Sequence, residues 1–324
     1  MNLNYSIFYK VFPSALARMI GGLIALLILS LQVYHLAPVE EGKQLIAVSI
    51  FNQEYIFPWT IVFLFDFICI ISSLLVVLRM NVNHRFVDGE SFPLAIFMLV
   101  AISSFPAIFI QPELLLVSLL GILIVYLLLN IYNKNSIVGI IFQTSFLCSI
   151  ATLFYAPSII FLLVILIGVS IFRPFNIRNL IIICIGFLLL YLYLFGLSYI
   201  FGWDINLFLN LKLELAKALE IPLNIEKIGL GIVFLILIIS ISSVYAKRQR
   251  LIVRQRNQLS VLFAAILLCL IVGLIFNFTG SFLFIFSLSG IFFLFFYKNI
   301  NKKWLVEVPL IVLLIYNTFV SIYS

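Results

Sequence analysis

Long apolar segments separated by short loops follow one another along almost the whole chain. Of its 324 residues, 65% are hydrophobic and 10% are charged, which is more apolar material than a single soluble core can bury. An apolar run of about 18 residues predicts a transmembrane helix, because a helix satisfies its own backbone N–H and C=O groups where water is absent. Leu114–Leu129 and Leu180–Leu190 are apolar on all sides, unlike the alternating strands of an outer-membrane barrel. The sequence therefore predicts an all-α, polytopic transmembrane helix bundle in a single membrane domain.

We predict about eleven spans from these runs. The fifth and sixth are separated only by Ala156 and Pro157, so they form either a tight hairpin or one broken, partly re-entrant element, and ten spans stay possible. The predicted spans are Ala15–Tyr34, Pro58–Leu78, Phe92–Ile110, Leu114–Tyr132, Ile137–Tyr155, Ser158–Phe172, Leu180–Phe201, Gly229–Tyr245, Val261–Phe276, Phe282–Tyr297 and Leu305–Tyr323.

The lysines and arginines predict which way the bundle faces. With a cytoplasmic N-terminus and a periplasmic C-terminus, only Lys43, Lys212, Lys217 and Lys227 fall in external segments, and the other basic residues lie inside. This distribution is the positive-inside bias of inner-membrane proteins. The net charge of +7 therefore reflects topology, and we expect membrane lipids and no nucleic acid as partners.

Two external segments are longer than tight turns, His35–Phe57 and Trp203–Ile228. Within the second, Asn206–Glu220 places polar residues at helical spacing among leucines. This pattern predicts an amphipathic helix in the outer membrane interface, although part of it also alternates as a strand does.

An acidic pair, Glu40 and Glu41, follows the first predicted span and lies close to His35. A carboxylate at an external membrane surface can act as a general base, or bind a divalent cation that neutralises a diphosphate leaving group. The alternative is an ordinary solvated loop. On the first interpretation Glu40 and Glu41 are candidate catalytic residues, His35 is a candidate substrate or lipid ligand, and a divalent cation is a possible cofactor.

The run from Pro38 to Ala47 resembles the acidic first-loop motif of polytopic glycosyltransferases of the GT-C superfamily. In this sequence Pro38 is followed by Val39, the two glutamates and, after five intervening residues, Ala47. The resemblance implies a membrane enzyme that takes a sugar from a polyprenyl-phosphate carrier at the outer leaflet. It also implies that Glu40 is the catalytic base and that Glu41 supports it. Glu40 stands where an aspartate is usual, and Lys43 replaces a small or aromatic residue.

A second resemblance covers three segments. They are Phe92 through Pro106, the corner from Leu153 to Pro157, and the turn from Ile171 to Arg178. Together they are similar to a functionally uncharacterised polytopic inner-membrane family of Bacteroidota. This resemblance implies a multi-pass protein of the inner membrane, without implying an activity.

Asp66 lies well inside the second predicted span. A carboxylate at that depth costs about 2.5–3.5 kcal/mol on insertion scales, so it faces the bundle interior, is protonated or meets a partner. Its functional interpretation is a proton relay or a substrate contact, and its structural interpretation is an acid bonded to a neighbouring helix. Other polar residues in the spans, among them Gln143, Thr144 and Asn317, are predicted to form hydrogen bonds between helices.

Two basic clusters lie on the predicted cytoplasmic side. Arg173 and Arg178 flank a turn that either sets the topology or binds a lipid phosphate, and Lys247–Arg256 either sets the topology or recruits anionic lipid. The four cysteines lie far apart, and the sequence contains no zinc-ligand spacing.

Three functions are compatible with these features. The first is a GT-C-like glycosyltransferase of envelope biogenesis. The second is a non-catalytic membrane subunit of an envelope or secretion assembly, with protein partners in the envelope. The third is a transporter that uses Asp66.

Overall fold

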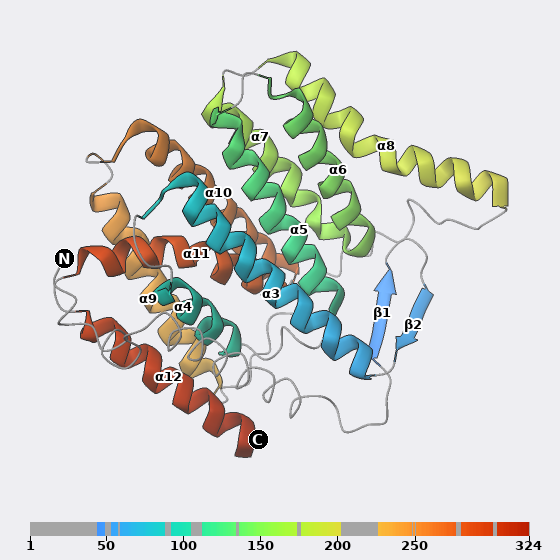
Figure 1. The fold of residues 1–324 in the computed structure, drawn as a ribbon. Helices are drawn as coiled ribbons and strands as arrows, with labels where there is room; N and C mark the ends of the chain where they lie inside the picture. The colour runs from blue at the N-terminus through green and yellow to red at the C-terminus, as the bar shows by residue number, and fades with distance from the viewer. Residues whose placement is uncertain are drawn as a thin grey trace.

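A computed structural model describes residues 44–48, 53–57, 59–87, 92–104, 112–133, 136–173, 176–201, 226–247, 249, 251–276, 280–300 and 303–323. The first predicted span, Ala15–Tyr34, and the predicted amphipathic helix, Asn206–Glu220, lie outside these residues. In the described part the chain is a helical bundle with one two-stranded hairpin (Figure 1). Its elements are β1 (Gln44–Val48), β2 (Gln53–Phe57), α3 (Trp59–His84), α4 (Phe92–Ser103), α5 (Pro112–Leu129), η3 (Asn130–Asn133), α6 (Val138–Phe154), η4 (Ala156–Ile159), α7 (Ile160–Phe172), α8 (Ile177–Phe201), α9 (Glu226–Ala246), α10 (Val253–Phe276), α11 (Gly280–Asn299) and α12 (Trp304–Tyr323).

Each predicted span from the second to the eleventh overlaps a described helix, and the end of the third, beyond Ser104, lies outside the described residues. Two helices run well past their predicted ends. The second span was predicted to stop at Leu78, but α3 continues to His84, and α10 begins at Val253 instead of Val261. Both extensions are polar, and they remain helical because Asn81, His84 and Gln258 pack inside the protein.

Among the described residues, five helices are long and apolar enough to cross a membrane, which indicates a helical membrane protein. The corresponding segments are Leu64–His84, Glu113–Tyr132, Ile177–Ile200, Val253–Gly273 and Ser281–Asn299. The other apolar helices, α4, α6, α7, α9 and α12, contain shorter stretches of this kind.

The fifth and sixth predicted spans are two separate helices. Tyr155 ends α6 in an extended conformation, and the 3₁₀ turn η4 leads into α7. The two helices then pack against each other and against α5 (Figure 1). Helix α6 starts shortly after α5 ends, and Phe172 at the end of α7 contacts Tyr132. The start of α6 and the end of α7 therefore both lie near the end of α5.

The sequence analysis did not predict the hairpin of β1 and β2. The strands pair antiparallel, with Gln44 opposite Phe57 and Val48 opposite Gln53. Both strands are rich in β-branched and aromatic residues, which favour extended structure. The described part of the chain is therefore helical apart from this short hairpin.

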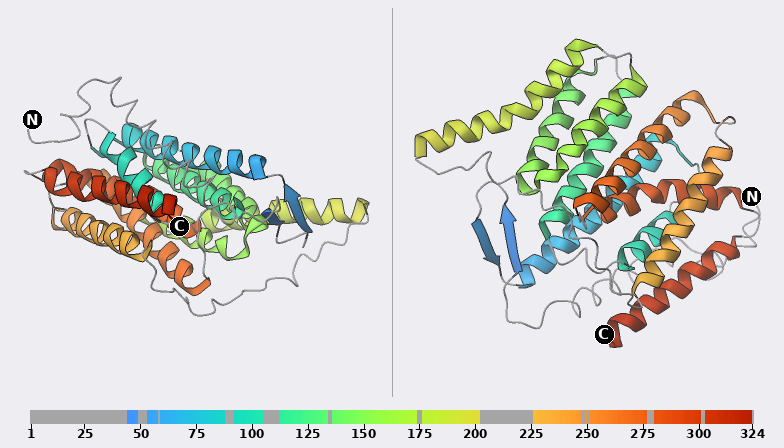
Figure 2. Two further views of the ribbon diagram at one scale, coloured as in Figure 1. Left: turned by 90° about the horizontal axis from the view of Figure 1, so that it is seen from below. Right: turned by 180° about the vertical axis from the view of Figure 1, so that it is seen from behind.

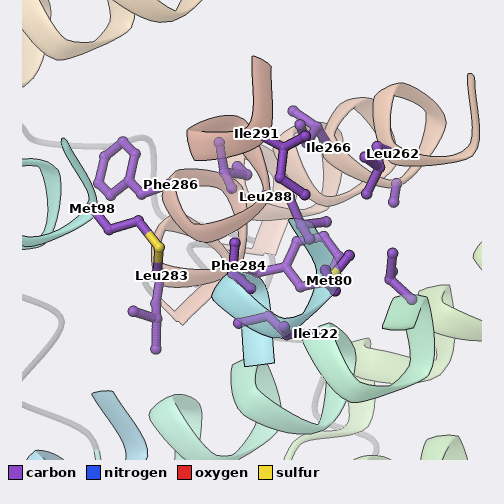
Figure 3. Close-up of a cluster of buried hydrophobic side chains, with 14 of the residues drawn as sticks. Met80, Met98, Ile122, Leu262, Ile266, Leu283, Phe284, Phe286, Leu288 and Ile291 are labelled. Carbon is purple, nitrogen blue, oxygen red and sulfur yellow. The ribbon is translucent and has the colours of Figure 1, made fainter. Parts of the chain in front are cut away.

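Helix α11 forms the centre of the bundle and packs against α3, α4, α5, α9 and α10. Figure 3 shows its buried side chains, including Phe284 and Leu288, among Met80, Met98 and Ile122 from three other helices. Phe293 stacks on Phe97 of α4, with 4.4 Å between the ring centroids. Helix α8, in contrast, packs against α6 and extends away from the bundle (Figure 2).

Among the described residues, one group of acidic side chains and one group of basic side chains lie in opposite halves of the bundle, and Lys227, Lys298, Lys303 and Glu307 belong to neither group. We call the end where α3 and α5 begin, which carries Asp66 and Glu113, the acidic end. We call the end where α3 and α5 finish and α10 begins the basic end. The described basic residues on or beside the basic end are Arg79, Arg85, Arg173, Arg178, Lys247, Arg254 and Arg256.

Candidate functional site

The proposed catalytic residues Glu40 and Glu41 lie outside the described residues, as does His35. The structure does place the segment that follows them, because β1 begins at Gln44 and contacts both α5 and α6. Figure 1 shows the hairpin beside the starts of α3 and α5. From Gln44 onward the chain is therefore placed at the acidic end of the bundle.

Asp66 is buried inside the bundle, with 2% of its surface exposed. It lies on the face of α3 that also carries the buried residues Cys69, Ile70 and Ser73. This spacing of three, four and seven residues keeps side chains on one side of a helix. The prediction that Asp66 faces the bundle interior is thus confirmed.

Glu113 is a second buried acid, and sequence analysis missed it. It occupies the first turn of α5 and is 9% exposed. Its carboxylate interacts with its own backbone N–H, one of the N–H groups that a helix start leaves unpaired. An acidic residue at this position is also favoured by the helix dipole, so the start of α5 can hold Glu113 without a basic partner.

The two carboxyl groups lie close enough to interact electrostatically. Asp66 Oδ1 and Glu113 Oε2 are both buried and have no hydrogen-bond partner among the described residues. Neither carboxyl group forms an ion pair in this part of the chain. Buried acids are normally hydrogen-bonded or paired, so the contacts within the described part of the chain do not account for this pair.

Two buried hydroxyl groups on α3 and α5 donate hydrogen bonds to backbone oxygens of their own helices. Ser73 Oγ donates to the backbone oxygen of Ile70 at 2.7 Å, and Ser118 Oγ donates to that of Leu114 at 2.8 Å. Both bonds stay within one helix. Among the described residues, each carboxyl group therefore keeps an oxygen without a hydrogen-bond donor, and a proton or a cation from outside the chain can bind there.

The carboxyl oxygens of the pair suit some cations better than others. Two carboxyl groups from α3 and α5 supply hard oxygen ligands, the type that protons, alkali cations and Ca²⁺ or Mg²⁺ prefer. The described residues contain no group of three or more His, Cys, Asp or Glu side chains that could hold a metal ion. A divalent cation at the pair would need further oxygen ligands.

The predicted ligands Arg173 and Arg178 do not join Asp66. Both are exposed and lie at the basic end, where α7 finishes and α8 begins. The Asn176 side chain accepts a hydrogen bond of 3.1 Å from the backbone N–H of Arg178, which stabilises this turn. The predicted site residues thus separate into an acidic group and a basic group.

No protein-family model matches the chain, and the chain is not significantly similar to a curated protein or to a solved structure. Its function must therefore be inferred from its own side chains.

Proposed function

We propose that the chain is a multi-pass inner-membrane transporter in which Asp66 and Glu113 bind a proton or a metal cation. The observation that carries the proposal is the buried carboxyl pair, in which each group keeps an oxygen without a partner. Ionisable residues inside membrane helices are rare and commonly mark the pathways of ions and substrates. Two such residues on neighbouring helices, α3 and α5, form a site that a cation can neutralise.

The energetic cost supports a functional role for the pair. On insertion scales one acidic side chain at the middle of a membrane helix costs about 2.5–3.5 kcal/mol, which is an upper bound here because the apolar spans of these residues begin at Leu64 and Glu113. Helix α5 offsets part of this cost for Glu113 through its N-terminus, whereas Asp66 lies within α3, away from either helix end. A bound cation would remove the repulsion and supply the missing partners of both oxygens.

The orientation of the proposed transporter follows from the basic end. Positive charge accumulates on the cytoplasmic side of inner-membrane proteins, so we assign the basic end to the cytoplasm and the acidic end to the periplasm. The carboxyl pair then receives its cation from the periplasmic side, where the segment with Glu40 and Glu41 enters the bundle.

Purified protein in liposomes tests this proposal with a pH-sensitive dye for protons and with isotopic Na⁺ for an alkali cation. We expect flux in the unmodified protein and its loss in Asp66→Asn and in Glu113→Gln. Glu307→Gln is the matched control, because Glu307 is also buried but accepts a hydrogen bond from the Tyr297 hydroxyl. Flux that survives both changes at the pair would contradict the proposal.

A second candidate is the GT-C-like glycosyltransferase that uses a polyprenyl-phosphate-linked sugar. The contact of β1 with α5 favours it, since this contact ties the loop of Glu40 and Glu41 to the end of the bundle that holds Glu113. In such an enzyme Glu40 would deprotonate the acceptor hydroxyl. The two buried carboxyl groups would contribute ligands for a divalent cation beside the diphosphate leaving group.

Sugar transfer from a polyprenyl-phosphate donor, measured with the purified protein, separates the two candidates. An enzyme loses transfer in Glu40→Gln, whereas a transporter shows no transfer and keeps its cation flux in that variant. Transfer that is unchanged in Glu40→Gln would exclude Glu40 as the catalytic base.

A further inference from the structure

A second buried polar cluster lies at the basic end and joins α3 to α10. Gln258 Nε2 lies 2.9 Å from His84 Nδ1 and 3.5 Å from the backbone oxygen of Leu129. His84 is 2% exposed and Gln258 is 0% exposed, so both side chains are inside the protein. Gln255, near the start of α10, donates to the backbone oxygen of Arg85 at 2.9 Å, and this bond fixes the end of α3 against α10.

The hydrogen bonds define the state of the imidazole ring. The Gln258 amide nitrogen lies between two acceptors, the Leu129 carbonyl oxygen and His84 Nδ1. His84 Nδ1 therefore accepts a hydrogen bond, and the proton of the neutral ring is on Nε2. His84 Nε2 is buried and has no partner among the described residues. It is an N–H donor inside the protein without an acceptor.

Arg254 supplies a second donor of this kind. It precedes Gln258 by one turn of α10 and lies close enough to His84 for an electrostatic interaction. Its guanidinium group lies over the Tyr132 ring, with 5.7 Å between Cζ and the ring centroid. Arg254 Nε is buried without a hydrogen-bond partner, and no described acidic residue pairs with the side chain. Gln258 Oε1 is a third buried polar atom without a partner.

We infer that His84, Arg254 and Gln258 form a binding site for a phosphate group, which an anionic lipid headgroup would supply. The unpaired N–H donors of His84 and of the Arg254 guanidinium group suit phosphate oxygens. Gln258 Oε1 can accept a hydrogen bond from a hydroxyl group of the same headgroup. Basic sites between membrane helices on the cytoplasmic side are typical places for anionic headgroups. The exposed side chains of Arg79 and Arg85 add positive charge at the same end.

This inference is independent of the proposed transport function, because the two clusters lie in opposite halves of α3. His84 follows Asp66 by 18 residues, which corresponds to about 27 Å of helix. A phosphate held by His84 and Arg254 would link the ends of α3, α5 and α10. Its expected effect is a gain in thermal stability that depends on the lipid, whether or not the chain transports a cation.

The site can be tested with delipidated protein in detergent. The protein is titrated with phosphatidylglycerol or with phosphatidylcholine, and binding is followed by native mass spectrometry and by thermal unfolding. We expect phosphatidylglycerol to bind at least about tenfold more tightly than phosphatidylcholine. Arg254→Gln should lose this preference, and Arg254→Lys should keep part of it because the charge remains. Arg256→Gln is the control, since it removes the same charge two residues away, on another face of α10.

If Arg254→Gln and Arg256→Gln weaken the binding of phosphatidylglycerol equally, the inference is overturned, because the lipid would then be attracted to a basic surface in general. Inorganic phosphate distinguishes the two sources of the group. If free phosphate protects the protein as well as the lipid does, and competes with it, the site binds phosphate but does not select a lipid. If free phosphate fails to compete, the lipid headgroup is the ligand.

Nitrogen NMR of labelled histidine gives a second readout that does not depend on folding of the arginine variant. The sequence contains two histidines, so a His35→Asn variant assigns the His84 signals. Addition of phosphatidylglycerol should shift the Nε2 signal of His84, and phosphatidylcholine should leave it unchanged. An Nε2 signal that does not respond while the lipid is bound would place the lipid elsewhere and overturn the inference.

Discussion

Asp66 of α3 and Glu113 of α5 interact electrostatically inside the bundle, and each has a buried carboxyl oxygen without a hydrogen-bond partner. Structural acids in protein interiors are normally satisfied by their neighbours. Glu307 illustrates this, because the Tyr297 hydroxyl donates to its carboxylate. The difference between Glu307 and the Asp66–Glu113 pair is the structural basis for assigning the pair a functional role.

Removal of the Asp66 carboxyl group is expected to leave the fold intact or to stabilise it. Asp66→Leu replaces an acid that has an unpaired oxygen with an apolar side chain in an apolar helix interface, so we expect an unchanged or higher unfolding temperature. Thermal unfolding in detergent measures this effect. If Asp66→Leu lowers the free energy of unfolding by more than about 1 kcal/mol, Asp66 has a structural role instead.

The membrane orientation can be tested with topology reporters. Alkaline phosphatase is active only outside the cytoplasm, so a fusion after Ala156, in the turn between α6 and α7, should be active. A fusion after Lys247, which follows α9 near the basic end, should be inactive and should give fluorescence with a green fluorescent reporter. The opposite pattern would place the basic end outside and contradict the assignment.

The sequence is sufficient to locate the helices, because long apolar runs have few structural alternatives in a membrane. Helix ends were harder to predict. The start of α10 contains Arg254, Gln255 and Gln258, so it has no apolar run that would mark it as part of a span, although Arg and Gln favour helices. Its contacts with His84 and Arg85 hold it against α3. The hairpin of β1 and β2 was missed for a related reason, since strand pairing depends on residues apart in sequence.

The candidate site was predicted only in part. Asp66 was identified because an acid inside an apolar run is conspicuous, and the prediction of its direction is confirmed. Glu113 lies at the edge of a run, where acids are common and usually solvated, so nothing in its local sequence indicates burial. Its association with Asp66 depends on the packing of α3 against α5, which residue spacing alone does not encode.

A predicted hydrogen bond between helices is confirmed for Asn317 and can be measured. Its Nδ2 donates to Ser103 Oγ at 3.0 Å and to Ser104 Oγ at 2.8 Å, so α12 is bonded to α4. We expect Asn317→Leu to lower the free energy of unfolding by about 1 kcal/mol, from an average of about 0.6 kcal/mol for each such bond in membrane proteins. Gln143→Leu is the control, because the Gln143 side chain is exposed on α6. Equal effects in both variants would show that the bonds to Asn317 add no stability.

The contact between α6 and α8 depends on the absence of a side chain at Gly186. A Cβ atom there would lie 2.9 Å from Ser145 Cβ and 3.0 Å from the backbone oxygen of Phe142, and a backbone atom cannot move without shifting α6. Gly186→Ala should therefore destabilise the protein by about 1–3 kcal/mol, the usual cost of overpacking.

Gly196→Ala provides the matched control on the same helix, because nothing lies within 4 Å of its added Cβ atom. An alanine there should be neutral, or should stabilise α8 by up to about 1 kcal/mol through its higher helix propensity. Thermal unfolding of both variants measures the difference. Adding Ser145→Gly to Gly186→Ala should recover part of the loss, since one of the two close contacts is removed while the Phe142 oxygen remains. If the two glycine variants unfold at the same temperature, α8 does not pack against α6 as closely as the structure shows.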